Sequence, residues 1–209
     1  MLRNAGRLFC PVALCLAAIG VIGQEKKSEG QTYYPLEVGN AWRYVNNIGN
    51  ESLTRVVRRE KVGNEEGFRL ETSVSNQVVS SEVLVVRADG IYRLKANDVP
   101  IEPPVPVLKW PAKAKDSWEV KAKVKDKTIE GKLSITATDE KVATRAGEFA
   151  CLKVSGENLQ LGGQKLSATY WYAPGMGPVK VSIKIGEQET SLELVEFTRS
   201  TGSVEKAKP

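Results

Sequence analysis

The stretch from Ser117 to Lys127 alternates apolar and polar residues almost without exception. One side of the extended chain carries Trp118, Val120, Ala122 and Val124, and the other carries Glu119, Lys121, Lys123 and Lys125. An α-helix would scatter those four apolar residues around its axis, whereas successive side chains of a strand point to opposite faces. After residue 23 the sequence contains no sustained helical period. The pattern therefore predicts an all-β protein whose strands bury one face.

Similar short runs recur between turn residues along the rest of the chain. Residues 67–74, 78–88 and 164–173 are examples, and dipeptides such as Asp89-Gly90 are typical of hairpin turns. We count about ten strands and expect a single curved antiparallel sheet, a half-barrel similar to periplasmic lipoprotein carriers. The domain is expected to span residues 24–199.

Residues 99–111 interrupt this rhythm with five prolines. A proline cannot donate to the hydrogen-bond ladder and is excluded from central strands. Because the apolar residues among them need cover, we predict a proline-rich loop that crosses the sheet.

The first 23 residues have the pattern of a secretory signal peptide. Arg3 and Arg7 precede an apolar stretch of about fifteen residues, which is short for a spanning helix, so cleavage after Gly23 is favoured over a retained anchor. Neither Cys10 nor Cys15 follows the small residue that lipidation requires. We expect an exported protein, periplasmic or extracellular, without a transmembrane span after cleavage. Residues 200–209 are too polar to pack and are expected to form a flexible tail.

Composition excludes several classes of function. The chain contains no histidine, and after cleavage Cys151 would be the single cysteine, buried between apolar neighbours. Common proton-transfer chemistry and cysteine-based zinc sites are therefore disfavoured. We predict no catalytic residues, no metal and no cofactors. Loss of residues 1–23 removes two arginines and no acid, so the net charge falls from +5 to +3, which disfavours nucleic acid as a partner.

Two segments resemble exported bacterial proteins of the TapB-like, domain-of-unknown-function family. They are residues 34–42 near the start of the domain and residues 170–180, which include Ala173-Pro174-Gly175-Met176-Gly177-Pro178. Shorter similarities at 108–111, 116–119 and 146–154 follow in the same order, although Lys115-Asp116 stands where the family has a glycine. The resemblance implies a curved antiparallel sheet and brings no established activity or catalytic residue.

Aromatic residues form the candidate site. A concave sheet lined by such side chains could hold an acyl chain, since small-ligand sites are mostly apolar clefts. The same side chains could instead simply fill a core, which is the more common outcome in a β protein. The candidate groove residues are Trp42, Trp110, Trp118, Tyr170 and Tyr172.

We therefore expect a non-catalytic extracytoplasmic protein that binds an apolar or amphiphilic ligand, with a lipid as the candidate partner. One alternative is an adaptor that meets another envelope protein through an edge strand or aromatic surface. A less favoured alternative is a carboxylate-dependent hydrolase that uses acids such as Glu71, Glu140, Glu187 or Glu189. The lysines of residues 121–125 could touch anionic headgroups, but they more simply keep a strand soluble.

Overall fold

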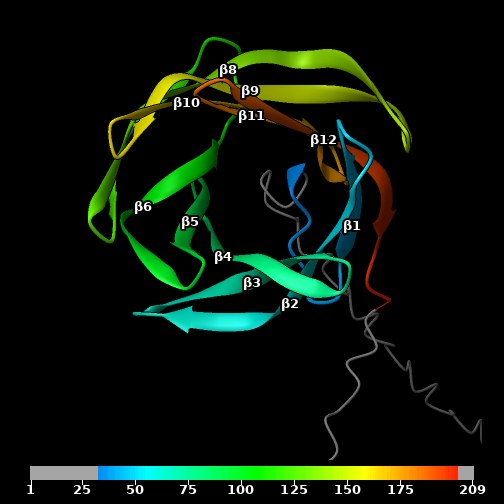
Figure 1. Cartoon of the computed structure of the whole chain (residues 1–209), viewed down its shortest axis with the longest axis horizontal. Helices are drawn as coiled ribbons and strands as arrows, with labels where there is room; N and C mark the ends of the chain where they lie inside the picture. Colours follow the sequence, from blue (N-terminus) through cyan, green and yellow to red (C-terminus); the bar gives the residue numbers. More distant parts are fainter. Residues whose placement is uncertain (1–32, 202–209) are drawn as a thin grey trace, which may run out of the picture.

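The computed structural model describes residues 33–201 and arranges them as a closed antiparallel barrel (Figure 1). Within this range the ring contains twelve strands, and β1 pairs with β12 to close it. The strands are β1 Ala41–Asn46, β2 Glu51–Val62, β3 Glu65–Val74, β4 Gln77–Arg87, β5 Gly90–Ala96, β6 Val99–Lys109, β7 Ser117–Val124, β8 Lys127–Thr144, β9 Gly147–Leu161, β10 Gln164–Ala173, β11 Gly177–Ile185 and β12 Gln188–Thr198. The all-β expectation is confirmed, but the half-barrel of about ten strands is wrong.

The ring closes because the two ends of the described chain pair with each other. β1 and β12 run in register from Ala41↔Thr198 to Asn46↔Leu192, with one shift after Arg43. Asn40 reinforces this closure, since its Oδ1 accepts a hydrogen bond from Ser200 N at 2.7 Å. The pairing joins residues about 150 positions apart in the sequence. Alternation within a strand carries no information about such a partner, which is why the sequence did not reveal it.

The proline-rich stretch is strand β6 and not a crossing loop, so that expectation is also wrong. β6 pairs with β5 from Gly90↔Lys109 to Ala96↔Val99, with two register shifts. On its other side only Ile101↔Val124 and Glu102↔Lys123 pair with β7. Proline removes backbone donors, so the strand keeps one ladder and loses most of the other. Trp118 bridges this seam by donating from Nε1 to Pro106 O at 2.9 Å.

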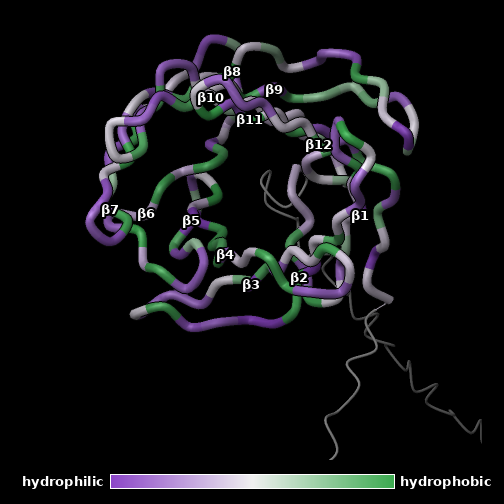
Figure 2. Tube along the Cα trace, in the orientation of Figure 1, coloured by the Kyte–Doolittle hydropathy of each residue, from purple (hydrophilic) through white to green (hydrophobic). Residues whose placement is uncertain are grey.

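The alternation predicted for residues 117–127 is confirmed in β7. Trp118, Val120 and Ala122 are buried, whereas the glutamate and lysines between them are exposed. Hydrophilic and hydrophobic stretches are both present all around the ring (Figure 2). Asp139 and Glu140 lie within β8, where the pairing with β9 shifts register between Ile135 and Glu140.

The barrel has two different ends. We call the end with the turns β1–β2, β3–β4, β5–β6, β7–β8, β9–β10 and β11–β12 the mouth, and the opposite end the plug end. Residues 33–40 lead into β1 at the plug end and bury Tyr34 and Leu36 in the core. Tyr34 meets Trp42 edge to face at 5.4 Å between ring centroids. This segment therefore fills one end of the barrel.

In residues 33–201 no helix is long and apolar enough to cross a lipid bilayer. The predicted signal peptide at 1–23 lies outside the described residues, and so does most of the predicted tail, from residue 202 onward.

Gly177 allows the plug end to pack. Its φ is +90°, and an added Cβ would lie 3.0 Å from Trp42 Nε1 and 3.3 Å from Tyr34 Cδ2. We expect Gly177→Ala to lower the free energy of unfolding in urea by about 2–4 kcal/mol, from backbone strain together with the overpacked core.

The matched control is Gly163→Ala. Gly163 also has a positive φ, +80°, but an added Cβ there meets nothing within 4 Å. It should therefore cost only the backbone strain of about 1–2 kcal/mol. Equal losses in the two variants would contradict the close packing at Trp42.

Candidate functional site

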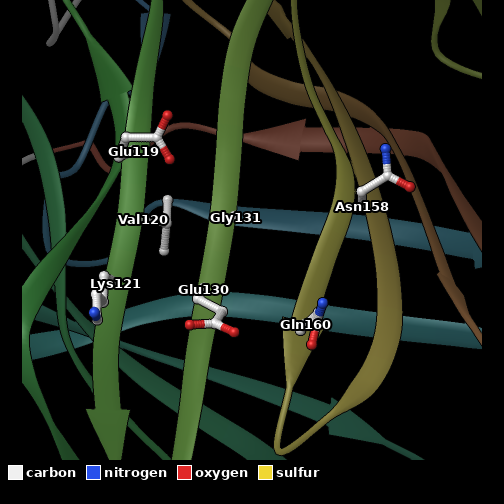
Figure 3. A pocket seen from close by; sticks show the side chains of 7 residues that line it. All are labelled: Glu119, Val120, Lys121, Glu130, Gly131, Asn158 and Gln160. Carbon is white, nitrogen blue, oxygen red and sulfur yellow. The ribbon is translucent and has the colours of Figure 1, made fainter.

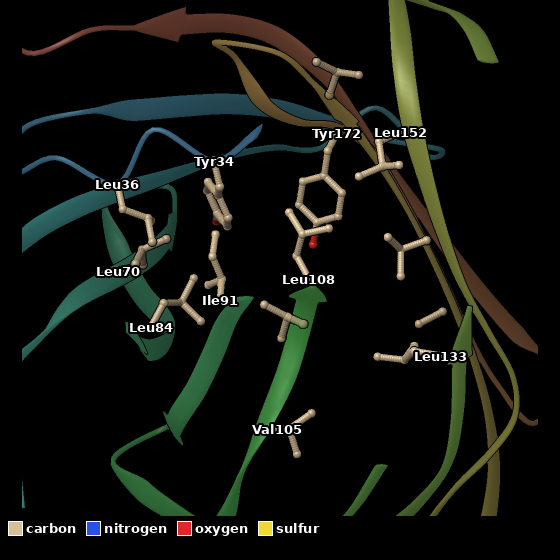
Figure 4. Close-up of a cluster of buried hydrophobic side chains, with 14 of the residues drawn as sticks. Tyr34, Leu36, Leu70, Leu84, Ile91, Val105, Leu108, Leu133, Leu152 and Tyr172 are labelled. Atoms are coloured by element: carbon tan, nitrogen blue, oxygen red, sulfur yellow. The ribbon is translucent and has the colours of Figure 1, made fainter. Parts of the chain in front are cut away.

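The inner face of the barrel is densely packed toward the plug end. Leu84, Ile91, Leu108 and Leu152 are each at most 1% exposed and converge from different strands (Figure 4). Trp42, which is fully buried, donates from Nε1 to Met176 O at 2.5 Å and stacks on Phe197. This half of the interior is a hydrophobic core.

Toward the mouth the inward-facing side chains become partly exposed. Thr54 and Thr72 share the inner face with buried Val56 and Leu70, and their hydroxyls lie 2.9 Å apart. Ile183 and Leu192 pack against the core from β11 and β12 and are also partly exposed. Because these side chains point into the ring, their exposure means that solvent reaches the mouth-side half of the interior. We call this part of the barrel the mouth-side interior.

An ion pair stands on the wall of the mouth-side interior. Arg93 on β5 donates from Nε to Glu82 Oε2 on β4 at 2.6 Å, and the two side chains are 30% and 24% exposed. Arg93 pairs in register with Leu84 and Val105, both buried on the inner face. The charge of Glu82 raises the pKa of Arg93, which therefore stays protonated.

Tyrosines from other parts of the barrel face this pair. Tyr170 and Tyr172 on β10 stack with their ring centroids 6.0 Å apart, and both act electrostatically on Arg93. Burial raises the pKa of Tyr34, Tyr44 and Tyr172, and the charge of Glu82 adds to that effect in each of them. Residues 33–40 and strands β1, β4, β5 and β10 thus bring phenol groups, one carboxylate and one guanidinium together across the interior.

The five aromatic residues predicted to form a groove lie in different places. Trp42 is in the packed half, and Trp118 closes the seam between β6 and β7. Trp110 lies just after β6, at the plug end, where its indole donates to Ala88 O at 2.6 Å. Tyr172 is buried, and Tyr170, partly exposed, is the member that borders the mouth-side interior. The structure therefore does not bring these five residues into one surface.

Glu82 and Arg93 are not among the candidate residues predicted from the sequence. Arg93 lies two residues after Ile91, and Glu82 lies two residues before Leu84, so each has the parity of an inward-facing position. A charged residue at an inward-facing position of a strand is the signal that could have identified this pair. In β4 the inward-facing series is hard to recognise because both faces are apolar: Val83 and Val85 form a second small cluster with Leu94 on the outer side.

A separate pocket of about 420 Å³ lies in the barrel wall (Figure 3). Its lining comes from three adjacent strands and is mostly polar: Glu119, Val120, Lys121, Glu130, Gly131, Asn158 and Gln160. Gly131 adopts a φ of +141° beside a register shift between β8 and β9, which opens the wall here. None of the predicted aromatic residues lines it.

Most of the acids considered for hydrolysis accept hydrogen bonds from neighbouring side chains. Glu71 accepts a hydrogen bond from Arg69 at 2.8 Å, and Glu189 accepts one from Ser182 at 2.9 Å. The Trp171 indole hydrogen bond lowers the pKa of Glu140, the opposite of what a general acid needs.

Cys151 is fully buried, as predicted, and burial raises its pKa to about 11. In residues 33–201 no group of three or more acids and cysteines is arranged to hold a metal ion.

Two crystal structures share this fold. One is a candidate lipoprotein from Parabacteroides distasonis, with a TM-score of 0.51 and 16% identity over 80% of this chain and 98% of that chain. The other is a candidate exported protein with a YmcC-like fold from Bacteroides fragilis, with a TM-score of 0.52 and 16% identity over 80% of this chain and 99% of that chain. The hypothetical lipoprotein YmcC from Escherichia coli matches at a TM-score of 0.37 and 7% identity, over 83% of this chain and 92% of that chain.

No protein-family model matches the chain, and no curated protein matches it. The first two structures show that the chain shares their fold, which for the Bacteroides fragilis protein is described as YmcC-like. The resemblance to the TapB-like family stays a prediction.

Pairing inside the barrel should couple Glu82 and Arg93 energetically. We expect Glu82→Gln and Arg93→Met each to destabilise the protein. The double variant should lose less than the sum of the two, with a coupling of about 0.5–3 kcal/mol in urea unfolding.

The matched control is the exposed pair Arg43–Glu196, whose side chains are 44% and 51% exposed. Its coupling should lie at about 0–1 kcal/mol. A coupling energy for Glu82 and Arg93 no larger than that of the exposed pair would contradict a stabilising ion pair inside the barrel.

Alkaline pH should destabilise the barrel. The unfolded chain loses thiol and phenol protons near their usual pKa values, while the folded chain holds those of Cys151, whose pKa is about 11, and of Tyr34, Tyr44 and Tyr172. Folding then binds protons, so stability is fully present below about pH 8, under the usual pKa of a thiol, and falls as pH rises toward the folded pKa values. Urea titrations from pH 8 to 11 should show a shallower fall for Tyr172→Phe than for the unchanged chain; parallel curves would argue against the buried phenol.

Proposed function

We propose that this is a non-catalytic extracytoplasmic protein that holds an amphiphilic molecule in the mouth-side interior. The observation that carries the proposal is the Glu82–Arg93 pair, which stands inside the barrel yet is about a quarter to a third exposed. A pair placed only for stability gains little from such a position, because desolvation offsets much of the attraction. A polar anchor in an otherwise apolar interior is instead typical of a ligand site.

The two parts of an amphiphile have separate partners in this region. Within residues 33–201 the Arg93 side chain makes a single hydrogen bond, from Nε to Glu82, and it is 30% exposed, so its terminal N–H groups are left without a protein partner in this range. A guanidinium presents five donors, so an oxygen-bearing head group can bind there. Tyr170, Ile183 and Leu192 are partly buried hydrophobic residues that a short apolar chain can cover.

Two further observations support an extracytoplasmic setting for this proposal. The first 23 residues have the pattern of a signal peptide. The proteins of Parabacteroides distasonis and Bacteroides fragilis that share the fold are themselves described as a candidate lipoprotein and a candidate exported protein.

A bulky residue at Ala96 should block binding. Ala96 pairs with Glu82, is partly buried against the core and faces the mouth-side interior. We expect Ala96→Trp to weaken binding of the fluorescent probe 11-(dansylamino)undecanoic acid at least about tenfold, because the indole would occupy the part of the mouth-side interior beside Glu82. The measurement is a fluorescence titration of the full chain.

The matched control is Arg55→Trp, which places the same side chain on the exposed outer face of β2. It should bind the probe like the unchanged chain. The proposal fails if the unchanged chain does not bind the probe and native mass spectrometry also finds no co-purified amphiphile. It fails equally if Ala96→Trp binds as well as Arg55→Trp.

A further inference from the structure

The large exposed hydrophobic side chains gather at one end of the barrel. In residues 33–201 there are six of them, and five lie on or beside turns at the mouth. These five are Ile48, Val74, Val78, Val79 and Ile185, and Ile48 and Val78 are 75% and 59% exposed. The sixth, Val38, lies at the plug end. Single exposed hydrophobic residues are ordinary, but their concentration around one opening indicates an interaction surface.

These residues occupy neighbouring turns of the ring. Ile185 precedes the β11–β12 turn, Ile48 lies in the β1–β2 turn, and the three valines flank the β3–β4 turn. Since β12 pairs with β1 and β2 pairs with β3, the three turns form one continuous sector. Asn47 N bonds to Ser191 O at 3.2 Å, which holds the first two turns together. We call this sector the apolar rim.

Lysines extend the rim on one side. Lys123, Lys125 and Lys127 lie at the β7–β8 turn against the single acid Asp126, and Lys165 lies just after the neighbouring β9–β10 turn. The β9–β10 turn contacts the β7–β8 turn, since the backbone N–H of Gly162 donates to Thr128 O at 2.8 Å. Gly186 N bonds to Lys165 O at 3.2 Å, which connects this basic side to the apolar rim beside Ile185. All four lysines are exposed.

Acids are also present at the mouth, and their placement fixes an orientation. Asp98 and Glu102 lie on the β5–β6 hairpin, where Arg69 donates to Asp98 at 2.5 Å. Glu187 and Glu189 lie beside the β11–β12 turn. A negatively charged surface would therefore attract the β7–β8 and β9–β10 turns and repel the β5–β6 hairpin and the two acids beside the β11–β12 turn. The mouth would meet such a surface at a tilt.

We propose that the mouth docks on an anionic lipid bilayer, with the apolar rim in the headgroup region and the lysines against the lipid charges. Apolar side chains and lysines at one surface are the combination that binds anionic membranes, because burial and charge attraction add. This docking goes beyond ligand binding in the mouth-side interior, and it concerns different residues. It would place the opening of the barrel toward a source of amphiphiles.

The test is flotation of the full chain with vesicles. We expect binding to equal parts of phosphatidylglycerol and phosphatidylcholine, weaker binding to pure phosphatidylcholine, and loss of the difference at about 0.5 M salt, where charges are screened. Ile48→Ser/Val78→Ser should weaken binding about tenfold or more. Lys125→Gln/Lys127→Gln should weaken it about twenty-five-fold on the anionic vesicles alone, near fivefold for each lysine.

The matched control makes the same kinds of change at the plug end: Val38→Ser with Lys113→Gln and Lys115→Gln, all exposed. It should bind like the unchanged chain. Every variant keeps residues 1–32 unchanged, so a difference between variants reports on the altered end alone. The proposal is overturned if the unchanged chain binds both vesicle types equally. It is also overturned if the serine or the glutamine double variant binds like the unchanged chain, or if the plug-end control loses as much binding as they do. Probe binding by Ile48→Ser/Val78→Ser measures the interior separately, so failure of docking does not count against ligand binding.

Discussion

Pairing of β1 with β12 is the interaction on which the rest of this structure depends. It turns an antiparallel sheet into a ring and thereby gives the protein an inside. A closed ring also removes the two free edges that an open sheet would expose to other chains. The edge-strand version of the adaptor hypothesis loses most of its basis for that reason, since only the short seam between β6 and β7 remains weakly paired.

The weakly paired seam between β6 and β7 shows the effect of the prolines, although the crossing loop predicted for them is in fact a strand. The prolines of residues 99–111 argue against a central strand, because proline cannot complete a hydrogen-bond ladder. β6 exists nonetheless, since one ladder to β5 is enough to hold it, and the apolar residues Val105 and Leu108 gain burial in the core. The missing ladder to β7 is the cost that the prolines impose, and the Trp118 indole offsets a small part of it.

The two halves of the interior follow from how the chain enters the ring. Residues 33–40 bring Tyr34 and Leu36 into the plug end, where they complete a core that excludes water. Nothing comparable among the described residues covers the mouth, so side chains such as Arg93 and Tyr170 stay partly hydrated there. An ion pair is tolerated at that depth because solvent reduces its desolvation cost, whereas the same pair beside Leu108 would be expensive. The polar anchor and the open half of the barrel are thus linked.

Much of this architecture is written in the sequence, because strand alternation is a local property. It determined that the protein is all-β, where most strands lie, and that Cys151 and Trp118 are buried. It did not determine which strand pairs with β1, that residues 99–109 form a strand, or that Glu82 and Arg93 meet inside the barrel. The five aromatic residues were grouped by type, but register sends Trp42 and Trp110 toward the plug end and leaves Tyr170 beside Arg93. Which side chains meet across a barrel depends on closure and register, and those are decided only when residues far apart in the chain pair.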